Sequence, residues 1–135
     1  MISFAVMTFM YRGWAEGADG SHGELIRIIA QAGAQGLEPF CNPFFDNAAL
    51  IRTYQQGLED TGLAIPVMDL IANLAEKPGP AREHAYETMR RGIDICDAFD
   101  AGIVHVAGCS LSEGVSAHDG RRLVAEGLND FADDV

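Results

Sequence analysis

The feature of this sequence that most limits its fold is an apolar strand pattern that recurs four times. The runs begin near residues 2, 36, 65 and 103, and one amphipathic helical pattern lies between each run and the next. Spacings of 34, 29 and 38 residues are typical of consecutive βα units, which build a parallel sheet with right-handed crossovers. We therefore predict an α/β fold with a parallel sheet, in which residues 1–135 form a single domain.

Each predicted helix has a start signal, either a capping residue or a proline suited to the first turn. The signals are Ser21 with Glu24, Asp46 or Asn47, Pro80, and Ser116 with Asp119. Apolar residues spaced three and four apart predict which helix faces are buried. For the first helix they are Leu25, Ile28, Ile29 and Ala32, and for the last Val124, Leu128, Phe131 and Val135.

Two architectures have this order of elements. A doubly wound, flavodoxin-like sheet closes a domain at about this length, whereas a (β/α)8 TIM barrel needs roughly 250 residues, so that four units make its N-terminal half. The doubly wound fold predicts a glycine-rich phosphate loop, and neither G-x-G-x-x-G nor G-x-x-x-x-G-K occurs. The half-barrel is the favoured prediction, and a flavodoxin-like ligand-binding domain is the alternative.

Both architectures bind ligands at the carboxyl ends of the strands. His105 lies in the fourth strand between Val104 and Val106, and because side chains alternate, it faces the opposite side from these valines. A histidine there either lines a pocket or is a hydrogen-bonded core residue. The predicted substrate pocket comprises Tyr11, Trp14, Glu38, Asn42, Asp69 and His105. The aromatic pair in the long first loop has a second interpretation, in which it covers one end of the core.

Composition excludes several classes of function. A formal net charge of -11 disfavours nucleic acid and anionic membranes as partners. No stretch is long and apolar enough to span a bilayer, and no secretory signal is recognisable at the start. Three cysteines without C-x-x-C spacing fit a reducing compartment. We therefore expect a cytoplasmic protein.

Three segments resemble those of a known family. AGAQGLEPF, GLAIPVMDL and AGIVHVAG follow a capped first helix in the order seen in the N-terminal half of the xylose isomerase-like TIM barrels. Within these the chain is most similar to the sugar phosphate isomerase/epimerase and hydroxypyruvate isomerase group. The resemblance implies a divalent metal ion (Mn²⁺, Mg²⁺, Co²⁺ or Zn²⁺) that holds two oxygens of a hydroxy-carbonyl substrate while a carboxylate moves a proton between adjacent carbons.

The resemblance also divides the roles between the two halves of the barrel. In the family the metal ligands, two glutamates, an aspartate and a histidine, come from strands five to eight. No catalytic residue and no metal ligand is therefore assigned within these 135 residues. Glu38 and His105 match pocket positions of the N-terminal half, and Tyr11 and Trp14 match its aromatic first loop, where they would position the substrate.

Several functions stay open at this point. The leading hypothesis is an isomerase or epimerase for a small sugar, sugar phosphate or keto acid, with the 135-residue chain inactive by itself. An endonuclease IV-like enzyme is a second possibility, which the net charge and the isolated histidines disfavour. A non-catalytic half-barrel is a third. Because its first and last strands would be open edges, we expect either a homo-oligomer or association with a C-terminal half.

Overall fold

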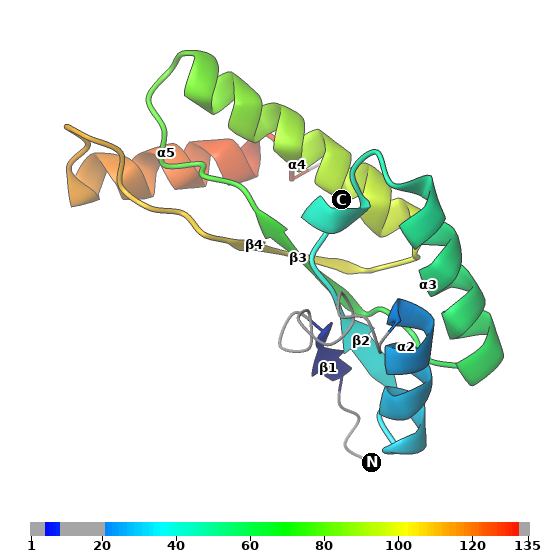
Figure 1. Cartoon of the computed structure of the whole chain (residues 1–135). Helices are drawn as coiled ribbons and strands as arrows, with labels where there is room; N and C mark the ends of the chain where they lie inside the picture. Colours follow the sequence, from blue (N-terminus) through cyan, green and yellow to red (C-terminus); the bar gives the residue numbers. More distant parts are fainter. Residues whose placement is uncertain (1–4, 9–20, 133–135) are drawn as a thin grey trace.

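The structure, a computed structural model, describes residues 5–8 and 21–132 (Figure 1). Strands and helices alternate along this part of the chain, as predicted. The elements are β1 (Ala5–Met7), α2 (His22–Gln31), β2 (Gly36–Glu38), the short 3-10 helix η2 (Asn42–Phe44), α3 (Ala48–Thr61), β3 (Val67–Ile71), α4 (Pro80–Ala98), β4 (Ile103–Ala107) and α5 (Ala117–Asn129). β2, β3 and β4 are shorter than the apolar runs that predicted them.

The four described strands follow one another in sequence order across the sheet. β1 pairs with β2 and β3 pairs with β4, both in parallel. Single parallel bridges, Gly36 with Ala64 and Phe40 with Asp69, join the two pairs. A flavodoxin-like sheet would place β1 between β2 and β3, so that alternative is wrong. Sequential neighbouring strands are the arrangement of a TIM barrel, and the chain contains four of its βα units.

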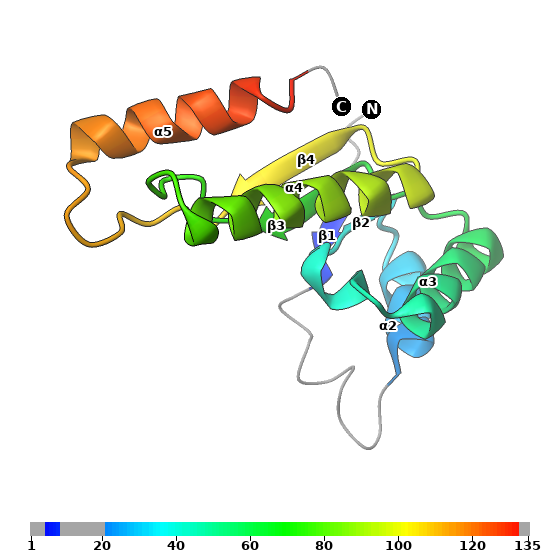
Figure 2. The ribbon, with the colours of Figure 1, turned by 90° about the horizontal axis from the view of Figure 1, so that it is seen from above.

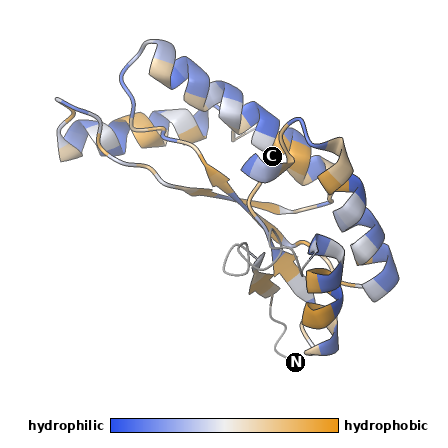
Figure 3. Cartoon of the chain, viewed as in Figure 1, coloured by the Kyte–Doolittle hydropathy of each residue, from blue (hydrophilic) through white to orange (hydrophobic). Residues whose placement is uncertain are grey.

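Helices α2, α3 and α4 lie along one side of the strands (Figure 1), and α4 contacts both β3 and β4 (Figure 2). Successive side chains of a strand point to opposite sides of the sheet, so one side packs into the core and the other faces away from it. Leu37, Met68 and Leu70 are fully buried in the core. The neighbouring positions Asp69 and His105 point to the opposite side, which we call the open face. Figure 3 shows the matching hydropathy, with apolar residues along the strands and polar residues over much of α4 and α5.

The predicted helix starts are confirmed at three caps. The side chain of Ser21 accepts a hydrogen bond from the Glu24 amide at 3.2 Å, and Ser116 accepts one from the Asp119 amide at 3.1 Å. Asn47, not Asp46, caps α3. Pro80 is the first residue of α4. None of the helices in the described ranges is long and apolar enough to cross a membrane.

The buried face of α2 matches the prediction in part, since two of the predicted residues are buried, Leu25 and Ile29. Ile28 is 46% exposed and Ala32 is exposed, whereas Ile26 is fully buried. The reason is Gly57 on α3, where a Cβ atom would lie only 2.8 Å from Cδ1 of Ile26. The missing side chain lets the two helices approach closely and draws Ile26 into the interface.

The buried face of α5 matches the prediction at Phe131, which is 4% exposed, and at Val124, which is partly buried against the core. It differs in that Leu123 and Gly127 are buried, whereas Leu128 is 44% exposed; Val135 lies outside the described residues. Gly127 packs on Leu74, whose side-chain atoms would lie 3.3–3.4 Å from a Cβ at that position. A glycine contact thus again decides which side of the helix faces the core.

Candidate functional site

Strand register brings three polar side chains together on the open face. Asp69 of β3 pairs directly with His105 of β4, and it also forms the bridge to Phe40. Glu38 precedes Phe40 by two residues and therefore lies on the same side of the sheet. One potential ligand atom from each of Glu38, Asp69 and His105 lies within 4.8 Å of the others. We call these three residues the acidic-histidine cluster.

Asp69 and His105 form the tightest contact of this cluster. His105 Nδ1 and Asp69 Oδ1 are 2.6 Å apart. The side chain of Asp69 is 1% exposed, whereas that of His105 is 60% exposed. The buried carboxylate can therefore orient the imidazole, and it leaves the outer part of the ring open to a ligand.

The backbone around Asp69 fixes its position. Its amide donates to the Pro39 carbonyl at 2.9 Å, and its carbonyl accepts from the Cys41 amide at 2.7 Å. These two bonds tie β3 to the residues after β2. The other carboxylate oxygen, Oδ2, is buried and has no hydrogen-bond partner among the described residues. A buried polar atom without a partner is costly, so this oxygen is suited to a bound ligand.

Asn42 is also at the strand ends, but its side chain bonds to backbone. Oδ1 accepts from the Ile71 amide at 2.9 Å, and Nδ2 donates to the Ile71 carbonyl at 3.2 Å. The side-chain amide of Asn42 thus makes two hydrogen bonds with the backbone of the last residue of β3. Its observed role is to connect the loop after β2 to the end of β3.

Further bonds connect the loops after β3 and β4. Asn73 Oδ1 accepts from the amides of Ala75 at 3.3 Å and Ser110 at 3.2 Å. Lys77 Nζ donates to the Gly114 carbonyl at 2.8 Å. The two loops that border the acidic-histidine cluster are therefore held together.

Cys41 follows β2 but is not available as a nucleophile. It is fully buried, with its Sγ 3.9 Å from Sγ of Cys96. The hydrogen bond with Cys96, together with burial, raises the pKa of Cys41 far above its usual range. A thiol that stays protonated is a poor nucleophile, so Cys41 contributes packing.

Of the six predicted pocket residues, the structure brings together Glu38, Asp69 and His105. Asn42 lies at the same strand ends with its polar atoms bonded to Ile71. Tyr11 and Trp14 lie outside the described residues. The direct Asp69–His105 contact is not predictable from the sequence pattern. The family resemblance places no metal ligand in this chain, whereas the three clustered residues have the donor atoms for one.

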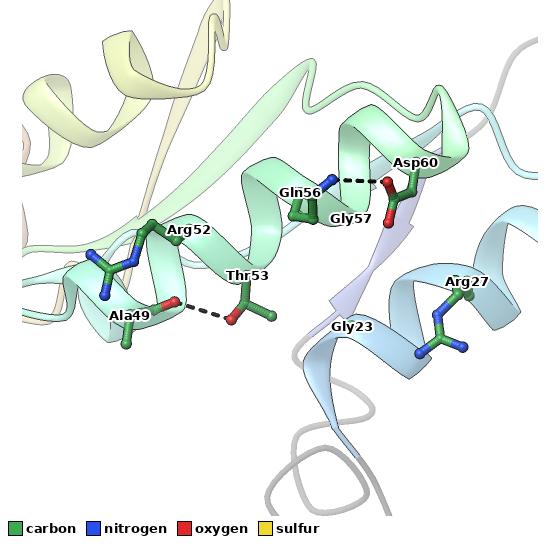
Figure 4. Close-up of a pocket in the computed structure, with 8 residues that line it drawn as sticks. All are labelled: Gly23, Arg27, Ala49, Arg52, Thr53, Gln56, Gly57 and Asp60. Atoms are coloured by element: carbon green, nitrogen blue, oxygen red, sulfur yellow. Dashed lines mark hydrogen bonds between the residues drawn. The ribbon is translucent and has the colours of Figure 1, made fainter.

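A surface hollow lies elsewhere, between α2 and α3 (Figure 4). Arg27, Arg52 and Asp60 are among the residues that line it, and it shares no residue with the acidic-histidine cluster. Gln56 and Asp60 bond to each other at 2.9 Å within α3. The hollow is an open gap between two amphipathic helices.

Comparisons with known proteins give a consistent result. The model of a family described as "Xylose isomerase-like TIM barrel" matches residues 26–135. A structure of D-psicose 3-epimerase in the presence of D-fructose is similar, with a TM-score of 0.77 and 17% identity over 98% of this chain and 48% of that one. The apo structure of a 3-keto-D-glucoside 4-epimerase from E. coli gives a TM-score of 0.71 and 13% identity, over 98% of this chain and 51% of that one. The chain thus spans about half the length of these structures. None of the curated proteins matches the sequence significantly.

Proposed function

We propose that this chain, which belongs to the xylose isomerase-like TIM barrel family, provides the N-terminal half of a sugar isomerase or epimerase. The substrate is a small hydroxy-carbonyl compound, a sugar, sugar phosphate or keto acid, and the enzyme is cytoplasmic. The observation that carries the proposal is the convergence of three polar side chains on the open face: Glu38, the last residue of β2, meets Asp69 and His105 from the middle of β3 and β4. TIM barrel enzymes hold their substrates at the carboxyl-terminal side of the strands, where β2 ends at Glu38.

The three residues have separate tasks in this proposal. His105 is largely exposed on the open face and donates to or accepts from a substrate hydroxyl. Glu38, which is half-buried, accepts from a second hydroxyl. Asp69 does not reach the substrate and instead fixes the orientation of His105 through their 2.6 Å contact. The arrangement positions a sugar whose reacting carbons lie beyond the first four strands.

We further propose that the enzyme depends on a divalent metal, as the family resemblance implies. When bound, such an ion polarises the oxygens next to the reacting carbons. The residues of this chain would orient the substrate toward that centre and exclude water from one side of it. Transfer of the proton belongs to carboxylates outside this chain.

The open sheet edges support a proposal about partners. Among the described strands, β1 and β4 each pair on one side only. Ile103 of β4 is 55% exposed, and Ile71 of β3 is 54% exposed. Unpaired edges with exposed apolar residues favour association, so we expect β4 to pair with another strand, from a second copy or from a C-terminal half. A well-folded monomer in sedimentation of the 135-residue chain would contradict pairing with a second copy.

The exchange of carbon-bound hydrogen in D2O tests the proposed reaction. Proton transfer next to a carbonyl replaces that hydrogen by deuterium, whichever isomer is formed. We expect the 135-residue chain to exchange no carbon-bound hydrogen of D-fructose. When the chain is joined to the C-terminal half of D-psicose 3-epimerase, we expect measurable exchange of that hydrogen.

Two variants of the joined protein locate the contribution of this half. His105→Gln should lower the exchange rate at least tenfold. Glu126→Gln, in an exposed side chain bonded to Arg122, should leave the rate unchanged. A joined protein that folds by circular dichroism but shows no exchange contradicts the proposal, as does exchange by the 135-residue chain alone.

A further inference from the structure

We propose that Glu38, Asp69 and His105 bind one divalent transition-metal ion of the Mn²⁺, Co²⁺ or Zn²⁺ type within this chain. This site would be additional to the metal centre that the family resemblance places in strands five to eight. It depends only on residues described here, and it would exist whether or not the chain takes part in sugar isomerisation.

The donor atoms of the three residues already lie close together. One ligand atom from each residue lies within 4.8 Å of the other two. An ion with bonds of about 2.0–2.2 Å holds neighbouring ligand atoms about 3–3.6 Å apart, so the side chains need to close by at most about 2 Å around it. Because His105 is 60% exposed and Glu38 is half-buried, both side chains have room to make this adjustment.

The buried carboxylate of Asp69 also favours a bound cation. This side chain is 1% exposed, and its Oδ2 is buried without a hydrogen-bond partner among the described residues. A carboxylate taken out of water is stabilised by a counter-charge and by occupied lone pairs. A metal ion at the centre of the acidic-histidine cluster supplies both. Binding of the ion would replace the 2.6 Å hydrogen bond between Asp69 and His105.

The chemistry of the donor atoms selects the type of ion. Two carboxylates and one imidazole combine hard oxygen ligands with a nitrogen ligand that suits Zn²⁺ and its first-row neighbours. Mg²⁺ and Ca²⁺ prefer oxygen-only sites. Three protein ligands also leave coordination positions free for water or for a ligand hydroxyl.

Titration of the tag-free, chelator-treated chain with Mn²⁺ tests the site, with free Mn²⁺ measured by electron paramagnetic resonance. We expect one tightly bound ion per chain. Asp69→Asn, His105→Gln and Glu38→Gln should each raise the dissociation constant at least tenfold. The matched control Glu126→Gln removes one carboxylate, as Glu38→Gln does, and should have no effect. Equal affinities for Glu38→Gln and Glu126→Gln would overturn the proposal.

Paramagnetic broadening of amide signals in the unmodified chain locates the ion without any substitution. We expect Mn²⁺ to broaden the signals of Phe40, Asp69 and His105 first. Broadening centred on the acidic residues of α5, or no saturable broadening, would overturn the proposal. Because the measurement needs no sugar, a chain that binds Mn²⁺ but no sugar would contradict only the proposed function.

Discussion

Replacement of Gly92 by alanine tests the packing that places the acidic-histidine cluster. Gly92 lies in α4 directly over Leu70 of β3, the residue next to Asp69. A Cβ at position 92 would lie 2.5 Å from Cδ2 and 2.9 Å from Cδ1 of Leu70. Ordinary carbon contacts are about 3.5–4.0 Å, so the overlap is about 1 Å or more. Leu70 is fully buried and cannot turn aside into solvent.

The net effect follows from two opposing terms. Overpacking of a core costs about 1–3 kcal/mol, and the change from glycine to alanine in a helix gains about 1 kcal/mol. We therefore expect Gly92→Ala to lower the free energy of unfolding by up to about 2 kcal/mol. The control is Gly23→Ala in α2, where the nearest atom of the described residues would be 3.9 Å away. That variant should be neutral or stabilised by up to about 1 kcal/mol.

Urea denaturation followed by circular dichroism measures both variants, and a double-mutant cycle identifies the contact. Leu70→Ala alone should cost about 2–5 kcal/mol because it leaves a cavity. In the Gly92→Ala background the same substitution should cost less, because the new methyl group partly fills that cavity. Equal effects of Gly92→Ala and Gly23→Ala, or strictly additive free energies in the cycle, would refute the packing described here.

Two further predictions concern thiol reactivity and a helix cap. Iodoacetamide should modify the exposed Cys109 in the native chain while Cys41 stays unmodified. The hydrogen bond with Cys96, together with burial, raises the pKa of Cys41 and keeps its thiol protonated. Peptide mass spectrometry that finds both cysteines labelled equally fast would contradict this prediction. Ser116→Ala should cost about 1 kcal/mol at neutral pH through loss of the α5 cap. The Ser116 hydroxyl lowers the pKa of Asp119, so the stabilisation is present above the ordinary aspartate pKa and is lost as pH falls through the lowered value. Unfolding curves from neutral to acidic pH should therefore show the difference between parent and Ser116→Ala narrowing toward low pH, and a constant difference would contradict the assignment.

The sequence was sufficient to predict the alternation of strands and helices, because strand runs, caps and prolines are local signals. It also identified Glu38, Asp69 and His105 as pocket residues, although Asp69 and His105 lie in the middle of their strands rather than at the carboxyl ends. It could not predict that Asp69 meets His105 directly, since a register shift of one residue would turn one of them to the other side of the sheet. Register depends on contacts between segments that are 36 residues apart.

The helix faces show a second limit of sequence patterns. Gly57 and Gly127 have no hydrophobic side chain, so a search for apolar spacing passes over them. In the structure their lack of a Cβ allows Ile26 and Leu74 to pack closely, and the buried faces of α2 and α5 turn accordingly. Close approach at a glycine becomes visible only when the neighbouring element is in place.

The most direct test of the central claim is a titration of the isotope-labelled chain with D-fructose, in the presence of a metal chelator, followed by amide and imidazole NMR signals. We predict saturable shifts at Glu38, Asp69 and His105, absent when acetone, which has a carbonyl group but no hydroxyl groups, replaces the ketose. Asp69→Asn should weaken the response of His105, because the imidazole then loses the carboxylate that orients it. Shifts that are absent, that acetone reproduces, or that lie in the hollow between α2 and α3 would contradict the assignment of the open face as the sugar site.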